Sequence, residues 1–188
     1  MDTKRKIFIG LTDEQRKGVI ELLNRDLSDT FLLFIKTKKA NWDVWGPQFK
    51  MLQRLWDEQS NALMRNIDSY ADRTKILGGY PVATVAGFLQ MASIQENPAV
   101  ESHTIQIVFS LLKDHEQIIC SLREHIDICS ERFHDKGTAD FLTVLMQHHE
   151  QMAWTLRSFM VRYFIEGEAF EMDEIFHHLT SNSIVTCP

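Results

Sequence analysis

Glycine and proline fall in a few places along this chain, and those places divide it into long helical segments. The 188 residues include four prolines and eight glycines. Gly46-Pro47 ends one helix and starts the next, because glycine suits a helix exit and proline suits the first helical turn. Residues 78–81, Gly-Gly-Tyr-Pro, stop the following helix after about seven turns. We therefore expect long helices and no strands.

The breakers define four long helices in two closely linked pairs. The first helix opens with a capping box at Thr12 and Gln15, and Thr138 is the expected N-cap of the fourth. Residues 78–101 form a long connection that contains a short amphipathic helix at Val85–Ala92. Two short-linked pairs joined by one long crossover describe an all-α, ferritin-like four-helix bundle. The expected helix ranges are about 12–39, 47–79, 102–133 and 138–164.

The bundle accounts for residues 12–164, with a basic arm at residues 1–11 and an acidic tail at residues 165–188. The net charge is −6, so the bulk surface should not attract nucleic acid. The arm carries Lys4, Arg5 and Lys6 and is the one basic cluster near a chain end. We therefore expect DNA binding to be weak.

The apolar runs are too short for a membrane or export segment. None approaches the roughly 18 residues that span a bilayer, and Ile7–Ile9 is too short for the core of a signal peptide. Cys120 and Cys129 fall on opposite faces of one expected helix, and Cys187 lies in the tail. Three unpaired cysteines are typical of a reducing compartment, which predicts a cytoplasmic protein.

The second helix carries a polar stripe beside its apolar face. At about 100° per residue, Gln53, Asp57, Asp68 and Asp72 all fall within about 100° of one another. Aspartate is a poor residue for a helix interior, and carboxylate oxygens are hard ligands suited to divalent metals. A metal site is one interpretation of the stripe, and a simple solvated helix face is the other.

A di-iron centre inside the bundle is not supported. Such centres take Glu-x-x-His from two helices and a Glu from each of the other two. Glu131-x-x-His134 lies at a helix end and Glu174-x-x-His177 lies in the tail, so the ligand set is incomplete. The tail doublet at residues 177–178 is only a weak metal-site candidate.

Two His-Glu pairs repeat on the inward faces of the third and fourth helices. They are His115-Glu116 and His149-Glu150. A histidine on an apolar stripe is more often a hydrogen-bonded core residue than a ligand, and we expect that role here. The sequence has no nucleophile elbow, phosphate-binding loop or Cys-x-x-Cys, so hydrolase, nucleotide-binding and dithiol functions have no support.

Several motifs follow one another in a specific order over residues 12–164. They are Leu23-Asn24-x-x-Leu27-x-Asp29, Asn41-Trp42-Asp43-Val44-x-Gly46-Pro47-x-Phe49, Asp68-x-x-Ala71-Asp72-Arg73, Gly137-Thr138-Ala139-Asp140 and His149-Glu150-x-x-Ala153-Trp154. This series resembles the Dps family of miniferritins. The resemblance implies a homo-oligomer, a hollow dodecamer, that oxidises Fe(II), stores ferric mineral and limits peroxide damage; many members also bind DNA.

The resemblance also implies a ferroxidase site between two subunits. The family's ligand pattern falls on Asn41, Gln53, Asp57, Asp68 and Asp72. Asp57 and Asp68 match that pattern, and Asp72 keeps the carboxylate but is one methylene shorter than the family's glutamate. Asn41 and Gln53 replace both histidines.

Asp140 matches the acidic residue of the family's iron-entry pore, where a ring of carboxylates would concentrate cations. A plain carboxylate favoured by the helix dipole is the alternative.

The loss of both histidines leaves three interpretations. An amide oxygen is a weak neutral ligand, whereas imidazole suits iron well. In the first interpretation, the chain is an altered ferroxidase that uses its carboxylates and amides. Alternatively, His148 or His149 supplies a ligand in a rearranged site. The third interpretation is a catalytically weak cage subunit with a structural or DNA-protective role.

Overall fold

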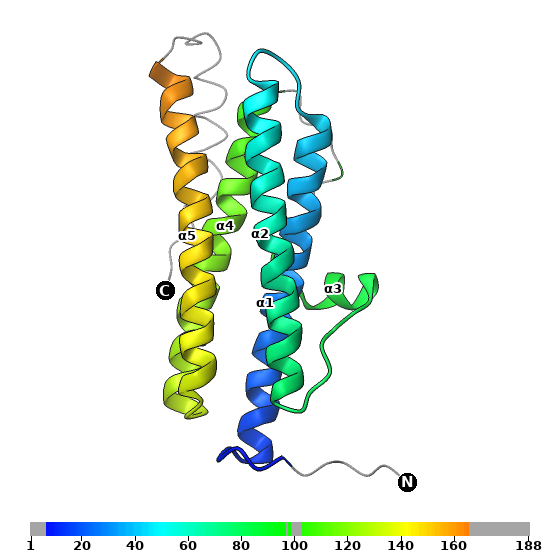
Figure 1. Cartoon of the computed structure of the whole chain (residues 1–188), viewed down its shortest axis with the longest axis vertical. Coiled ribbons are helices and arrows are strands. Elements are labelled where there is room, and N and C mark those ends of the chain that lie inside the picture. Colours follow the sequence, from blue (N-terminus) through cyan, green and yellow to red (C-terminus); the bar gives the residue numbers. More distant parts are fainter. Residues whose placement is uncertain (1–6, 97, 99–102, 166–188) are drawn as a thin grey trace.

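The computed structural model describes residues 7–96, 98 and 103–165, and of residues 161–165 the backbone only. Four long helices stand side by side, and the short helix α3 lies beside them on the side away from α5 (Figure 1). The described residues form no strands. The expected all-helical, ferritin-like four-helix bundle is confirmed. The helices are α1 (Asp13–Asp43), α2 (Phe49–Ile76), α3 (Val85–Met91), α4 (Thr104–Asp127) and α5 (Lys136–Ile165).

The first helix begins as expected but ends later. The Thr12 side chain accepts from the backbone N–H of Gln15, and the Gln15 side chain accepts from that of Thr12, so the capping box is present. α1 continues to Asp43 instead of ending near Lys39, which places Asn41 on the helix. The turn that follows uses Gly46 at φ 98°, a left-handed conformation that glycine adopts without strain.

The crossover is fastened to α1 by two polar residues of the first motif. Asn24 Oδ1 accepts from the backbone N–H of Val82 at 2.8 Å. Asp29 accepts from the backbone N–H groups of Ser93, at 2.6 Å, and Ile94, at 3.1 Å. These bonds satisfy loop donors that would otherwise be left unpaired in a partly buried segment. They therefore hold the segment that connects α2 to α4 against α1.

The second helix pair is joined through a π-helical turn and an aspartate cap. The π-helix η1 (Ile128–Arg132) follows α4 directly. Asp135, not Thr138, caps α5, because its Oδ1 accepts from the backbone N–H of Thr138 at 2.9 Å. The same carboxylate accepts from Arg73 of α2 at 3.1 Å. The expected Thr138 cap is wrong because α5 already begins at Lys136, so Thr138 lies inside the first turn and its backbone N–H and hydroxyl donate to Asp135.

The cysteines differ from one another in state. Cys129 is free and buried, whereas Cys120 is disulfide-bonded. The expectation of three unpaired cysteines is therefore wrong for Cys120. Cys187 lies outside the described residues, together with residues 1–6 of the basic arm and residues 166–188 of the acidic tail, including His177 and His178.

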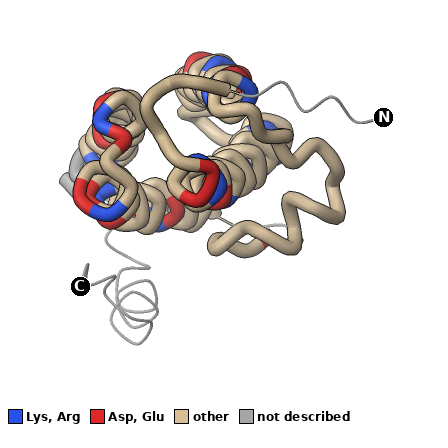
Figure 2. Tube along the Cα trace, turned by 90° about the horizontal axis from the view of Figure 1, so that it is seen from below, with Lys and Arg blue, Asp and Glu red and all other residues tan. Residues whose placement is uncertain are grey.

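The described helices carry charges of both signs on their outer faces. In the end-on view, segments with Lys or Arg alternate with segments that carry Asp or Glu (Figure 2). None of the described helices combines the length and apolar character needed to cross a membrane.

Candidate metal site on the outer face of α2

The polar stripe of α2 contains two separate groups. Gln53 and Asp57 are one turn apart, and Asp68 and Asp72 are also one turn apart. Asp57 and Asp68 are three turns apart, about 16 Å along the helix axis at 1.5 Å per residue. Ligand oxygens lie about 2 Å from a metal ion. One ion cannot therefore bind both groups within a single chain.

The first group is completed by α1. Asn41 is 6% exposed near the end of α1, and its Nδ2 donates to the backbone oxygen of Gln53 at 2.9 Å. Because this bond joins the end of α1 to the start of α2, Asn41, Gln53 and Asp57 lie at the same end of the helix pair. We call these three residues the amide half-site. The three aspartates on the stripe are all exposed, and Gln53 is half-buried.

A lysine that the sequence analysis did not consider accompanies the amide half-site. Lys38 Nζ lies 3.5 Å from Oδ1 of Asp57. A cation there opposes the positive charge of a metal ion on the same carboxylate. The sequence feature that indicates its proximity is its position three residues before Asn41, which places both residues on neighbouring parts of the α1 surface.

Asp68 and Asp72 form the second group, which we call the carboxylate half-site. Both side chains are exposed in the C-terminal half of α2. Between the two half-sites lies Met64, a large apolar side chain that is 39% exposed. Among the described residues of one chain, no three His, Cys, Asp or Glu side chains gather closely enough to hold a metal ion.

The histidines proposed for a rearranged site lie away from the stripe. His149 is fully buried, and its Nδ1 is 3.0 Å from Nδ1 of His115. His148 is exposed, with Nδ1 3.1 Å from Oδ1 of Asn66. Asn66 lies about 120–180° around α2 from the stripe residues. Neither histidine therefore reaches the stripe of its own chain.

The remaining candidates lie at helix ends. Asp140 is exposed on the second turn of α5. Glu131 belongs to η1, and His134 follows it with φ 55°, so this pair sits where α4 turns toward α5. Neither lies in the middle of the bundle.

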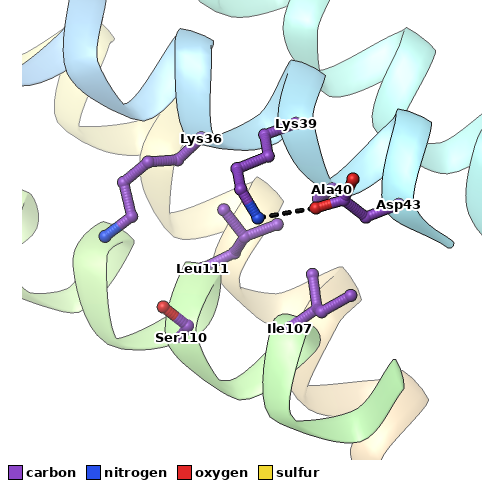
Figure 3. A pocket seen from close by; sticks show the side chains of 7 residues that line it. All are labelled: Lys36, Lys39, Ala40, Asp43, Ile107, Ser110 and Leu111. Carbon is purple, nitrogen blue, oxygen red and sulfur yellow. Dashed lines mark hydrogen bonds and ion pairs between the residues drawn. The ribbon is translucent and has the colours of Figure 1, made fainter. Parts of the chain in front are cut away.

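A small pocket on the opposite side of α1 faces α4. Its lining residues are Lys36, Lys39, Ala40, Asp43, Ile107, Ser110 and Leu111 (Figure 3). Lys39 Nζ contacts Asp43 at 2.6 Å, and Lys36 Nζ contacts Asp114 at 2.5 Å. These lysines already have carboxylate partners, and the cavity of about 30 Å³ has room for little more than a water molecule. The pocket is therefore separate from the candidate metal site.

The fold and the sequence together define the class of protein. The ferritin-like domain model matches residues 20–163. DpsC from Streptomyces coelicolor superposes with a TM-score of 0.80 at 25% identity, covering 83% of this chain and 91% of that one. Dps from Bacillus brevis superposes with a TM-score of 0.75 at 29% identity, covering 80% and 99%. This is a ferritin-like protein.

Two sequence relatives narrow the class. A DNA protection during starvation protein of Bacillus anthracis is 35% identical over 77% of this chain and 97% of its own. An uncharacterized low temperature-induced protein of Nostoc sp. is 52% identical over 88% and 90%. The chain belongs to the Dps family within the ferritin-like proteins, and it is a Dps-like miniferritin.

Proposed function

We propose that this chain oxidises Fe(II) and stores ferric iron in a hollow dodecamer, at a site that two subunits complete together. The observation that carries the proposal is the division of the α2 stripe into two half-sites about 16 Å apart. The amide half-site supplies Asn41, Gln53 and Asp57. The carboxylate half-site supplies Asp68 and Asp72 from another subunit.

The spacing of the stripe suits a two-fold axis. Gln53 and Asp72 are equally far in sequence from a point between Ala62 and Leu63. Asp57 and Asp68 share the same midpoint. Two α2 helices that run antiparallel through a two-fold axis there would place each amide half-site opposite a carboxylate half-site. The exposed Met64 beside that midpoint suits burial between two subunits.

The ligand set suits iron as a substrate that binds at the site as Fe(II), is oxidised there and moves on to be stored. Three carboxylates balance the charge of Fe(II) and, better, of Fe(III), which favours the oxidised product at the site. The amide oxygens of Asn41 and Gln53 contribute neutral, weak ligands. Oxygen or peroxide from solution takes the electron that each Fe(II) loses. Lys38, beside Asp57, should weaken the first binding step.

Iron supply and location complete the proposal. Asp140, exposed near the start of α5, would line an acidic entry pore where several subunits meet. The cytoplasmic location was predicted from three unpaired cysteines; because Cys120 is disulfide-bonded, it now rests, like the dodecameric state, on the family resemblance.

The alternative is a catalytically weak cage with a structural or DNA-protective role. The absence of imidazole at positions 41 and 53 favours it, because the amides bind iron less well. Several relatives in the family are named for DNA protection.

An anaerobic Fe(II) titration, followed by separate additions of oxygen and peroxide, tests the proposal. We expect the natural protein to bind and oxidise Fe(II) and Asp57→Ala to lose both properties. Glu58→Ala is the matched control, since this neighbouring carboxylate is exposed and paired with Arg54 at 2.9 Å. Equal oxidation by the natural protein and Asp57→Ala would overturn the proposed site, and no oxidation by either would favour the structural alternative.

A further inference from the structure

The middle of α4 carries a cysteine that is already oxidised. Cys120 is half-buried and disulfide-bonded. The chain has three cysteines, and Cys129 is free. Within one chain, this leaves Cys187 as the remaining candidate for the second sulfur of the bond.

The chemistry of Cys129 agrees with its being left out. It follows Cys120 by nine residues, and at about 100° per residue the two fall on opposite sides of a helix. Cys129 is buried, and burial raises the pKa of its thiol to about 12. Because the thiolate is the species that forms and exchanges disulfides, this thiol does not compete at neutral pH.

Cys120 lies in a groove between α4 and α5, which stand side by side (Figure 1). Two ion pairs join the helices along the groove, about one turn before and one turn after Cys120. They are Arg157–Glu116 at 2.7 Å and Arg123–Glu150 at 2.5 Å. The groove has a volume of about 460 Å³, and its lining residues are Glu116, Ile119, Cys120, Glu150, Ala153 and Arg157.

We propose that this groove binds the acidic tail of the same chain, residues 166–188, and that a disulfide between Cys120 and Cys187 fixes the tail there. The tail carries five acidic residues and no Lys or Arg. Arg123 and Arg157 are exposed beside the groove, and each pairs with one glutamate. A guanidinium has five N–H donors, so both arginines have donors left for carboxylates of the tail.

The tail is long enough to make this connection. Ala153 lines the groove, and α5 ends at Ile165, which is about 18 Å farther along the helix axis at 1.5 Å per residue. The chain from Ile165 to Cys187 spans up to about 70 Å when it is extended. The tail can therefore turn back at the end of α5 and reach Cys120 with chain to spare.

The bond makes tail binding respond to peroxide. Hydrogen peroxide takes two electrons and two protons from the two thiols: its O–O bond breaks, one S–S bond forms and two water molecules leave. Reduced glutathione reverses the bond by thiol–disulfide exchange. The tail is therefore fixed when peroxide exceeds the supply of small thiols. This step does not use the α2 stripe.

Peptide mapping tests the pairing. The full-length protein is reduced, oxidised with hydrogen peroxide, alkylated while unfolded and digested with trypsin without further reduction. We expect residues 114–123 to be joined to residues 163–188, with Cys129 alkylated in the separate peptide 124–132. A link between two copies of peptide 114–123, or no link in the natural protein, would overturn the proposal.

The variants in the mapping experiment separate the cysteines and the iron site. Cys129→Ser should keep the link, and Cys187→Ser should lose it. Asp57→Ala should also keep the link, so loss of the proposed iron site leaves this result unchanged. A link that survives in Cys187→Ser would contradict the pairing.

The equilibrium with glutathione tests the groove itself. At low salt, Arg157→Glu should lower the equilibrium constant for disulfide formation several-fold, because the new carboxylate repels the acidic tail. The exposed Arg157–Glu116 pair contributes little to folding, so the variant should keep its structure. Arg54→Glu is the matched control, because it makes the same charge change in an exposed ion pair on α2. Equal constants for Arg157→Glu and the natural protein would show that the tail does not occupy the groove.

Discussion

Asn41 donates a hydrogen bond from its side chain to the backbone oxygen of Gln53, across the gap between α1 and α2, at 2.9 Å. The two positions where the family resemblance places histidines are therefore adjacent in the folded chain. The same bond directs the Asn41 amide nitrogen, not its oxygen, toward α2. The amide nitrogen of Asn41 thus joins α1 to α2, and the amide oxygen is the only polar atom of this side chain that remains to bind a metal.

Replacing both amides should strengthen iron binding. We expect Asn41→His combined with Gln53→His to bind Fe(II) at least about 10-fold more tightly and to oxidise it faster, a gain of about 1.4 kcal/mol or more. Each change supplies an imidazole nitrogen beside carboxylates that are already present. Anaerobic titration and stopped-flow oxidation measure both effects. Adding Asp57→Ala to the double variant should abolish the gain, and a double variant that binds no better than the natural protein would contradict the assignment.

The acidic pore prediction concerns the rate of iron entry. We expect Asp140→Asn to slow Fe(II) uptake several-fold at low salt, with the difference disappearing near 0.5 M salt, because a carboxylate ring acts through a screened field. Asp127→Asn is the control, since it removes the same charge from another exposed position. Unchanged uptake by Asp140→Asn at low salt would leave Asp140 as an ordinary carboxylate near a helix N-terminus.

Local sequence signals account for the helices, but not for which of two nearby residues caps a helix or for which side chains contact each other between helices. The 3.6-residue period correctly predicts the α2 stripe and the inward faces of His115 and His149. Thr138 and Asp135 are both good cap residues, and both contact Arg73 of α2, which is far away in sequence. The contact of Lys38 with Asp57 likewise depends on how α1 and α2 pair. Pairing of helices is a property of the packed core and cannot be read from one segment.

The same limit applies to the candidate site. The sequence and the resemblance together supply its five residues, and helix geometry adds that one chain cannot assemble them. The His115–His149 contact was not predictable, because the periodicity places each ring inward but says nothing about the register between α4 and α5.

A buried ion pair should make stability fall as the pH rises. Asp26 Oδ1 and His125 Nδ1 are 2.8 Å apart. Burial alone would lower the pKa of His125, but the hydrogen bond and charge of Asp26 outweigh it and raise the pKa above 6.5. Burial raises the pKa of Asp26 above 3.8, against the opposing effects of His125. The native pair therefore holds its protons more tightly than the unfolded chain does.

The sign of the effect follows from that difference. Stabilisation by His125 is complete below pH 6.5 and is lost as the pH rises through the raised native pKa; Asp26 acts in the same direction from pH 3.8 upward. We expect the free energy of unfolding, measured by urea titration, to decline as the pH rises above 6.5, by at most about 1.4 kcal/mol per pH unit for His125, and the urea midpoint to fall with it. His125→Gln should flatten this part of the profile. A midpoint that rises over the same range would show that the pair is not protonated in the native state.

DNA binding should depend strongly on salt. The net charge is −6, and charges of both signs alternate around the described helices (Figure 2). A dodecamer would present the basic arm many times, so binding at low salt should be measurable and should disappear near about 150 mM salt. Deleting residues 1–11 should abolish the low-salt shift in a gel assay. A shift that persists at about 150 mM salt would mean that the arm outweighs the surface charge.

The central claim, that two subunits complete one iron site, is tested most directly by mixing two inactive variants. Asp57→Ala damages the amide half-site and Asp68→Ala the carboxylate half-site, so each cage alone should lose Fe(II) oxidation. In a mixed pair across a two-fold axis, one site receives both defects and the other receives neither. Co-expressed in equal amounts, the variants should therefore recover about a quarter of the natural oxidation rate. Recovery near that level supports the two-subunit site, and mixed cages as inactive as the separate variants would contradict it.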